Sequence, residues 1–242
     1  MRYAIYFVAD PDSELAELGA RWLGYDVETG TTFAAPVVAG LEAAVWSRLV
    51  GEPARYGLHA TLKAPFRLAA DCGESELVDA LRDFARSVAP VRLPVMSLVN
   101  LRGFFALMPA IRNDGAEDLS ARALRAFEPF RAPLSPPEIA RRQAAGLSDR
   151  QQALLDRWGY PYALDEASFH ITLTGRLAAE DAEAIEAILT DFFEPAIGRP
   201  LMVDRLALAV EREPGARFEV LAAAPLGHPL AYTRRAIQLD AI

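Results

Sequence analysis

The chain has 242 residues, 52% of them hydrophobic, and a formal net charge of −8. This composition excludes an intrinsically disordered protein, and the length is enough for one large domain or two small lobes with a full core. The negative charge argues against general affinity for long nucleic acid, which is itself a polyanion. The single cysteine, Cys72, has no partner for a disulfide within the chain or for a thiolate metal cluster.

No segment of the sequence reads as a targeting or membrane element. The apolar N-terminal stretch, residues 3–8, stops at Asp10-Pro11 and is too short for a signal peptide. No apolar run approaches the length of a membrane helix. We therefore expect a cytoplasmic protein in a reducing compartment, monomeric and without a membrane partner.

Hydrophobic periodicity predicts helices and strands in alternation along the chain. Ser135 and Ser148 each begin a capping-box sequence, which indicates a helical hairpin in the middle of the chain. The expected helices are 13–23, 38–49, 74–88, the hairpin within 128–168, and 180–192; the expected strands are 58–64, 91–98, 103–109, 169–175, 201–208 and 217–223. The connector at 128–168 either packs as a spacer or leans over a cleft as a lid, and the sequence leaves both open.

Two of the three histidines stand in the same tetrapeptide frame, His-x-Thr-Leu. They are His59-Ala60-Thr61-Leu62 and His170-Ile171-Thr172-Leu173. Since threonine is scarce in this chain, the coincidence has odds on the order of one in ten thousand. The third histidine, His228, lies in a Gly-His-Pro turn without the motif, and we assign it a structural role.

The sequence around the two motifs repeats as well. Each motif strand is followed by a predicted helix and two predicted strands, which gives repeat units at about 59–110 and 170–225. We predict a single bilobal domain over residues 1–242, in which the units form two similar lobes related by a pseudo-twofold axis. If the solvent-exposed faces of the two motif strands meet between the lobes, they form a cleft.

Strand alternation selects the candidate site residues. His59, Thr61 and Lys63 share one side of the first motif strand, and His170, Thr172 and Thr174 share one side of the second. A histidine pair can supply the base and the acid of a reaction on a phosphoester, and a threonine hydroxyl can donate to a phosphate oxygen.

Further candidates for substrate binding precede or end the first motif strand. Lys63 offers a point charge for a phosphate, and its alternative is a solvated strand end. Arg55 and Tyr56 could contact a phosphate or a ring, or serve only packing. For Tyr160 and Tyr162, which precede the second motif, we favour packing over a place in the substrate wall.

Paired His-x-Thr-hydrophobic motifs in two repeated units resemble the two-histidine (2H) phosphoesterase superfamily. The local sequences Arg55–Lys63 and Ser168–Gly175 are most similar to a bacterial branch described as a phosphonate-metabolism protein and found near carbon–phosphorus lyase genes. The resemblance implies a duplicated α+β fold with two antiparallel sheets facing a central cleft and helices outside. It also implies cleavage of a small cyclic phosphodiester without a metal, with His59 and His170 as acid and base and Thr61 and Thr172 on the phosphate oxygens.

The competing functions are an RNA-end or nucleotide-binding protein and an RNA-processing enzyme of the 2H ligase type. Both intact motif copies favour an enzyme over a binding module, and the acidic charge disfavours long RNA. The expected partner is therefore a small phosphoester, most plausibly ribose-derived. No cofactor is expected, because the sequence has no Gly-rich phosphate loop and no metal-ligand spacing beside the histidines.

Overall fold

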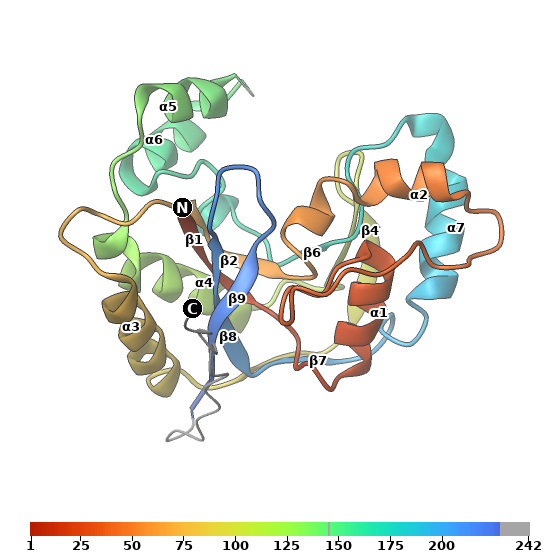
Figure 1. Cartoon of the computed structure of the whole chain (residues 1–242), viewed down its shortest axis with the longest axis horizontal. Helices are drawn as coiled ribbons and strands as arrows, with labels where there is room; N and C mark the ends of the chain where they lie inside the picture. The colour runs from red at the N-terminus through yellow and green to blue at the C-terminus, as the bar shows by residue number, and fades with distance from the viewer. Residues whose placement is uncertain (145, 228–242) are drawn as a thin grey trace, which may run out of the picture.

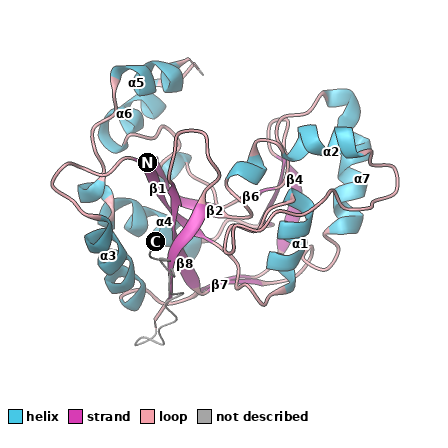
Figure 2. Ribbon diagram, viewed as in Figure 1, coloured by secondary structure: helices cyan, strands magenta, loops and turns pink. Residues whose placement is uncertain are grey.

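The computed structural model describes residues 1–144 and 146–227, and in these ranges the chain folds around one large antiparallel sheet (Figures 1 and 2). The seven strands lie in the order β4-β5-β6-β2-β1-β8-β9, so the two motif strands β2 and β6 occupy the centre. Their bounds are β1 (Arg2–Phe7), β2 (Ala60–Phe66), β4 (Met96–Asn100), β5 (Phe105–Pro109), β6 (Ile171–Thr172), β8 (Arg205–Glu211) and β9 (Glu219–Pro225). The α+β class is confirmed, and the two expected sheets are joined into one through β2 and β6.

Helices cover this sheet in two groups (Figure 1). Helices α3 (Glu74–Arg86) and α4 (Asp114–Ala126) pack against the part that contains β2, β8 and β9. Helices α1 (Glu14–Leu23) and α7 (Ala182–Phe192) pack at the other end, where the Trp22 indole N–H donates to the Leu173 carbonyl at 2.8 Å and its ring contacts Phe193. The remaining helices are α2 (Ala43–Val50), α5 (Pro136–Gln143), α6 (Asp149–Trp158) and the short 3₁₀ turns η1 (Pro53–Arg55), η2 (Glu128–Phe130), η3 (Leu164–Glu166) and η4 (Ala179–Asp181).

The order of elements is the same in both repeat units, each with one strand more than predicted, and the units exchange their hairpins. After β2 come α3, β3 (Val91–Leu93), β4 and β5; after β6 come α7, β7 (Leu201–Val203), β8 and β9. The β4–β5 hairpin of the first unit pairs with β6, whereas the β8–β9 hairpin of the second unit pairs with β1 beside β2. Each side of the sheet therefore contains strands from both units, and a lobe is not a contiguous stretch of sequence.

A crossing in the middle of each unit produces this exchange. The predicted strand 91–98 divides at Pro94, which cannot donate to a strand ladder, and 201–208 divides at Asp204. The short pieces β3 and β7 then pair with each other in a separate two-stranded sheet, with Val91 opposite Val203. The chain can change direction between the short piece and the long strand, so each hairpin reaches the opposite side.

Most predicted helices begin close to where their caps place them. Both capping boxes are formed, at Ser135 for α5 and at Ser148 for α6. Helix α2 starts at Ala43 and not at residue 38, because Gly40 has a φ of +76°, a left-handed conformation that a helix cannot continue through. His228 lies outside the described residues.

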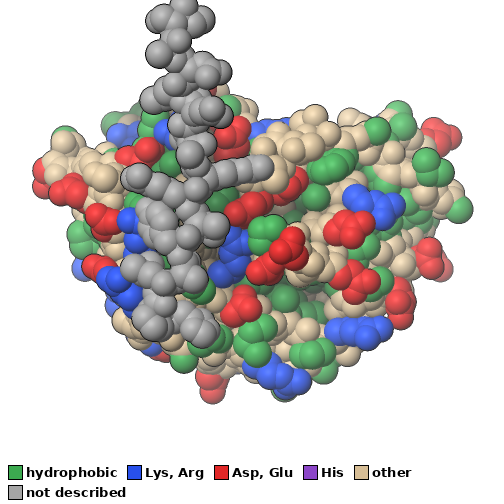
Figure 3. Space-filling model, turned by 60° about the horizontal axis from the view of Figure 1, so that its bottom comes forward, with side chains coloured by type: hydrophobic (Ala, Val, Ile, Leu, Met, Phe, Trp, Pro, Cys, Tyr) green, Lys and Arg blue, Asp and Glu red, His purple; other side chains and the backbone are tan. Residues whose placement is uncertain are grey.

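The molecular surface mixes charges of both signs. On the described part of the face drawn in Figure 3, acidic and basic side chains are interspersed with hydrophobic ones and no continuous basic band is visible. None of the helices in the described ranges is long and apolar enough to cross a membrane.

The structure corrects the position of Lys63. Between Thr61 and Lys63 the pairing of β2 with β1 shifts by one residue: Thr61 lies opposite Tyr6, but Lys63 lies opposite Ile5. A bulge of this kind turns the following side chains to the other face of the strand. Lys63 is 2% exposed and packs toward α4, where its ammonium donates to Glu128 at 2.7 Å and to the Leu124 carbonyl at 3.3 Å.

This placement makes Lys63 a structural residue, which can be tested by removing each partner of the ion pair. We expect Lys63→Met to leave kcat and KM unchanged within about threefold and to change stability little, because Met fills the buried site and Glu128 keeps its ion pair with Arg131. Glu128→Leu should cost about 3 kcal/mol, since it leaves the buried ammonium without its carboxylate. Denaturant unfolding and steady-state kinetics measure both effects; a large loss of kcat in Lys63→Met would return Lys63 to the site.

Candidate active site

The pairing of the two motif strands brings the four motif side chains together. Ala60 lies opposite Ile171 in an antiparallel bridge, so by register His59 lies opposite Thr172 and Thr61 opposite His170. Ala60 and Ile171 point into the core, at 0% and 1% exposure, and the four flanking side chains therefore project from the other face. Each histidine has the threonine of the other motif beside it. The two histidines are diagonal neighbours across the strands, a relation in which residues stand about 7–8 Å apart at the backbone.

Both imidazoles are oriented by the same local hydrogen bond. Nδ1 of His59 lies 2.9 Å from the Gly57 carbonyl, and Nδ1 of His170 lies 2.8 Å from the Ser168 carbonyl. A carbonyl only accepts, so each Nδ1 carries a proton, and Nε2 is the nitrogen left to exchange protons. Gly57 can present its carbonyl this way because its φ is +69°, and an added Cβ would meet the Val27 side chain at 2.4 Å.

His59 lies in an aromatic enclosure. The Tyr6 ring centroid is 4.0 Å from the imidazole centroid and the Tyr56 centroid 5.8 Å, and Phe218 stacks behind Tyr56 at 5.2 Å. Burial lowers the pKa of His59 to about 4, against the raising effect of the Gly57 hydrogen bond, and nearby His170 lowers it further. His59 is therefore neutral at pH 7, with Nε2 free to accept a proton.

The motif residues line a cavity of about 920 Å³, which contains His59, Thr61 and Thr172, and an adjoining one of about 490 Å³, which contains His170. Thr61, Phe104 and Arg176 are common to both cavities, so the two form a continuous groove over the central strands. In the described chain, neither the Thr61 nor the Thr172 hydroxyl has a hydrogen-bond partner, so both remain available to a ligand.

The other predicted binding residues have different placements. Arg55 and Tyr56 line the larger cavity. Thr174 lies at its floor, 1% exposed, and its hydroxyl accepts from the Phe105 backbone N–H at 2.9 Å, which ties it to the scaffold. Arg55 is held by Glu211, whose carboxylate also accepts from Arg2. Burial raises the pKa of that carboxyl, but the hydrogen bonds from Arg2 and Arg55 outweigh this and lower it to about 2.

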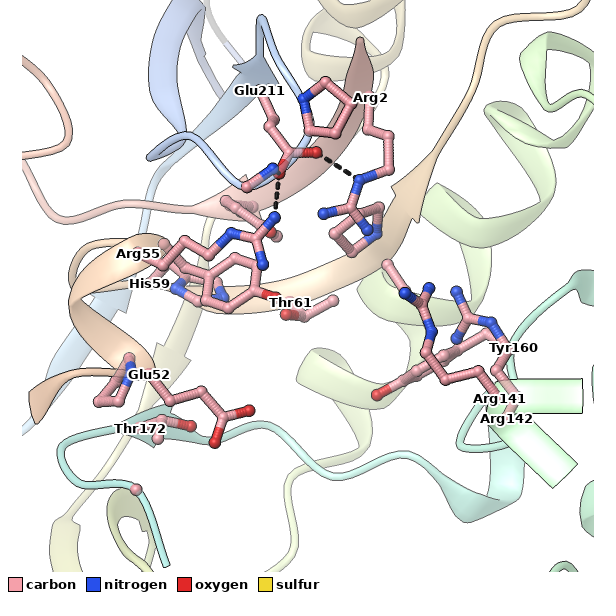
Figure 4. Close-up of a pocket in the computed structure, with 18 of the residues that line it drawn as sticks. Arg2, Glu52, Arg55, His59, Thr61, Arg141, Arg142, Tyr160, Thr172 and Glu211 are labelled. Atoms are coloured by element: carbon pink, nitrogen blue, oxygen red, sulfur yellow. Dashed lines mark hydrogen bonds and ion pairs between the residues drawn. The ribbon is translucent and has the colours of Figure 1, made fainter. Parts of the chain in front are cut away.

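Several lining residues were not predicted from the sequence. Figure 4 shows Arg2 and Glu211 above the motif residues, Glu52 beside Thr172, and two arginines of α5, Arg141 and Arg142, extending into the cavity from the far side. Tyr160 also lines the cavity, whereas the sequence favoured packing for it. The sequence gives only a weak signal for the α5 arginines. They lie in the predicted connector, and only the folding of that connector brings them to the cavity. Among the described residues, no three His, Cys, Asp or Glu side chains gather as metal ligands.

The fold and the site define an α+β protein with a two-histidine site at the centre of an antiparallel sheet. The chain belongs to the family described as "Protein of unknown function (DUF1045)", which matches residues 61–219. It is 38% identical over 221 residues to a protein of Janthinobacterium sp. (strain Marseille) named "Ribose 1,5-bisphosphate phosphokinase PhnN", covering 90% of this chain and 49% of the relative. A protein of the same name from Laribacter hongkongensis (strain HLHK9) is 38% identical over 220 residues, covering 91% and 50%. The chain thus spans about half the length of these relatives.

Among solved structures, the chain is similar to one described as "Crystal structure of phosphoesterase", with 16% identity and a TM-score of 0.40 over 94% of this chain and 99% of that one. It is also similar to "Crystal structure of E.coli LigT complexed with 3'-AMP", with 14% identity and a TM-score of 0.40 over 94% and 98%.

The Tyr6 hydroxyl is buried and has no hydrogen-bond partner within residues 1–144 and 146–227, and this can be tested by removing it. Tyr6→Phe should keep or raise the unfolding free energy, by up to about 1–2 kcal/mol, because it removes an unpaired buried hydroxyl. Tyr25→Phe is the matched control: its hydroxyl donates to the Phe218 carbonyl at 2.8 Å, so its loss should cost about 1 kcal/mol. Denaturant unfolding measures both, and a destabilised Tyr6→Phe would show that the hydroxyl is satisfied in the folded protein.

Proposed function

We propose that this chain is a phosphoesterase that hydrolyses a small cyclic phosphodiester, with His59 as general base and His170 as general acid. The proposal is supported by the register of the motif strands, in which two imidazoles and two threonine hydroxyls, neither with a hydrogen-bond partner among the described residues, share one face of the sheet. A phosphate diester seated on this face would have a histidine on each side and a hydroxyl for each non-bridging oxygen.

The different surroundings of the histidines support these roles. Neutral His59 accepts a proton at Nε2 from water, and the water oxygen bonds to phosphorus from the side opposite the leaving oxygen. His170, as imidazolium, donates its Nε2 proton to that oxygen as its bond to phosphorus breaks. Thr61 and Thr172 donate to the non-bridging oxygens, where negative charge increases in the transition state. The product is a phosphate monoester, and the two histidines have exchanged protonation states.

A ribose-derived substrate is favoured by the curated relatives, whose name specifies ribose 1,5-bisphosphate. This chain contains no Gly-rich phosphate loop. The half of those relatives that it matches therefore does not include a nucleotide-binding unit built on such a loop. The simplest function for such a unit is to act on a sugar phosphate that is chemically related to the ribose 1,5-bisphosphate in that name. We keep the phosphonate-metabolism setting and a cytoplasmic location as part of this proposal.

The proposal is tested by turnover of a panel of 2′,3′-cyclic nucleotides and ribose cyclic phosphates, assayed in EDTA. We expect turnover by the wild type, and a loss of kcat of roughly 10²- to 10⁴-fold in His59→Ala and in His170→Ala, the usual contribution of a positioned acid or base. Thr61→Val and Thr172→Val should lose less. Turnover that EDTA abolishes and zinc or manganese restores would contradict the mechanism, and so would much faster cleavage of an oligonucleotide or tRNA bearing a cyclic-phosphate end.

The lowered pKa of His59 fixes the direction of the pH dependence. The base functions only when deprotonated, so kcat/KM should fall only below about pH 5, as His59 gains a proton near its pKa of about 4. Tyr56→Ala, which opens the enclosure to water, should move the acid limb upward toward the ordinary pKa of about 6.5. Tyr162→Ala, an exposed residue on the His170 side, is the control and should leave this limb in place.

A further inference from the structure

The larger cavity carries more positive charge than the phosphodiester site uses. Of the carboxylates that line it, Glu211 is bound by Arg2 and Arg55, Glu138 accepts from Arg67 and from Ser135, and Glu52 lies beside Thr172 (Figure 4). Across the cavity from His59, Arg141 and Arg142 extend from the last turn of α5 (Figure 4). In the part of the chain that the structure describes, neither has a carboxylate partner.

The surroundings of Arg142 are aromatic and half-buried. Its guanidinium lies over the Tyr160 ring, 5.5 Å from the centroid, and its buried Nε has no hydrogen-bond partner among the described residues. Burial lowers its pKa most, and the charges of Arg141 and Arg2 lower it further; Tyr160 and the carboxylate of Glu138 act in the opposite direction but do not cancel the shift. The guanidinium stays protonated at neutral pH. A half-buried cation facing two like charges with an unused donor is costly unless an anion enters.

We propose that Arg141 and Arg142, with Arg2, form a second anion subsite, which binds a phosphate monoester carried by the substrate in addition to the phosphodiester cleaved at the histidine pair. The inference rests on the proposed function for the role of the histidines, but the subsite itself rests on the arginines. Planar guanidinium groups pair with phosphate through two parallel hydrogen bonds, which suits them to this task. The cavity of about 920 Å³ accommodates a sugar with two phosphates, since small-molecule sites run roughly 300–1,000 Å³.

The kinetic test compares two probes, adenosine 2′,3′-cyclic phosphate and the same nucleotide with a 5′-phosphate. In the wild type, kcat/KM should be higher for the 5′-phosphorylated probe by about 10- to 100-fold, the effect of one well-placed charged contact. In Arg141→Gln/Arg142→Gln this preference should fall to near 1, while the unphosphorylated probe is turned over at the wild-type rate within about threefold. An equal loss on both probes, or no change in the preference, would overturn the proposal.

Arg157→Gln is the matched control. Arg157 lies in the last turn of α6 in the same insertion, with its guanidinium 4.7 Å from the centroid of the Trp158 ring, and it does not line either cavity of the site. It therefore shares the stacking and the helix-end position of Arg142 without the proposed ligand. The substrate preference should be unchanged in this variant. A loss equal to that of the double variant would assign the effect to the stability of the insertion.

A binding experiment separates this proposal from the catalytic one. Isothermal titration with ribose 1,5-bisphosphate and with ribose 5-phosphate should show tighter binding of the bisphosphate by at least about tenfold, lost in the double arginine variant and retained in His59→Ala. If no cyclic phosphate is turned over but this difference holds, the catalytic proposal fails and the subsite stands. If the arginines instead strengthen only the binding of an oligoribonucleotide, they contact a backbone diester and the subsite proposal is wrong.

Discussion

The rest of the site depends on one backbone pairing, that of Ala60 with Ile171. The two residues are small and apolar enough to be buried side by side, which turns the polar residues before and after them outward together. Since the pairing is antiparallel, each motif supplies a histidine beside the other motif's threonine. A shift of one residue in this register would bury the imidazoles, so core packing and active-site geometry are set by the same contact.

The sequence predicts the parts of this arrangement that depend on local pattern. The duplicated motif identified both histidines and both threonines, and Ser135 and Ser148 located the α5–α6 hairpin through their capping boxes. Helix α4 and strand β1 were not predicted, although β1 supplies Tyr6 and pairs with β2. The N-terminal apolar run was interpreted only as too short for a signal peptide, because nothing in its own pattern tells that it lies between two distant strands.

Features that depend on contacts between distant parts of the chain could not be predicted from the sequence, for a physical reason. The bulge that turns Lys63 toward Glu128 is a mismatch between two strands, so a strict alternation within one strand cannot predict it. The position of Arg141 and Arg142 likewise depends on where the connector folds back. Only the folded chain brings their charges into the same cavity as Arg2. The enclosure whose burial lowers the pKa of His59 includes Tyr6, which is 53 positions away in the chain.

The exchange of hairpins between the repeat units makes each unit depend on the other. A single unit has a motif strand but not the hairpin that completes its side of the sheet, because that hairpin comes from the other unit. One unit alone would therefore leave strand edges open and only half of the histidine pair in place. The sheet and the histidine pair are thus completed together, by the same exchange of strands.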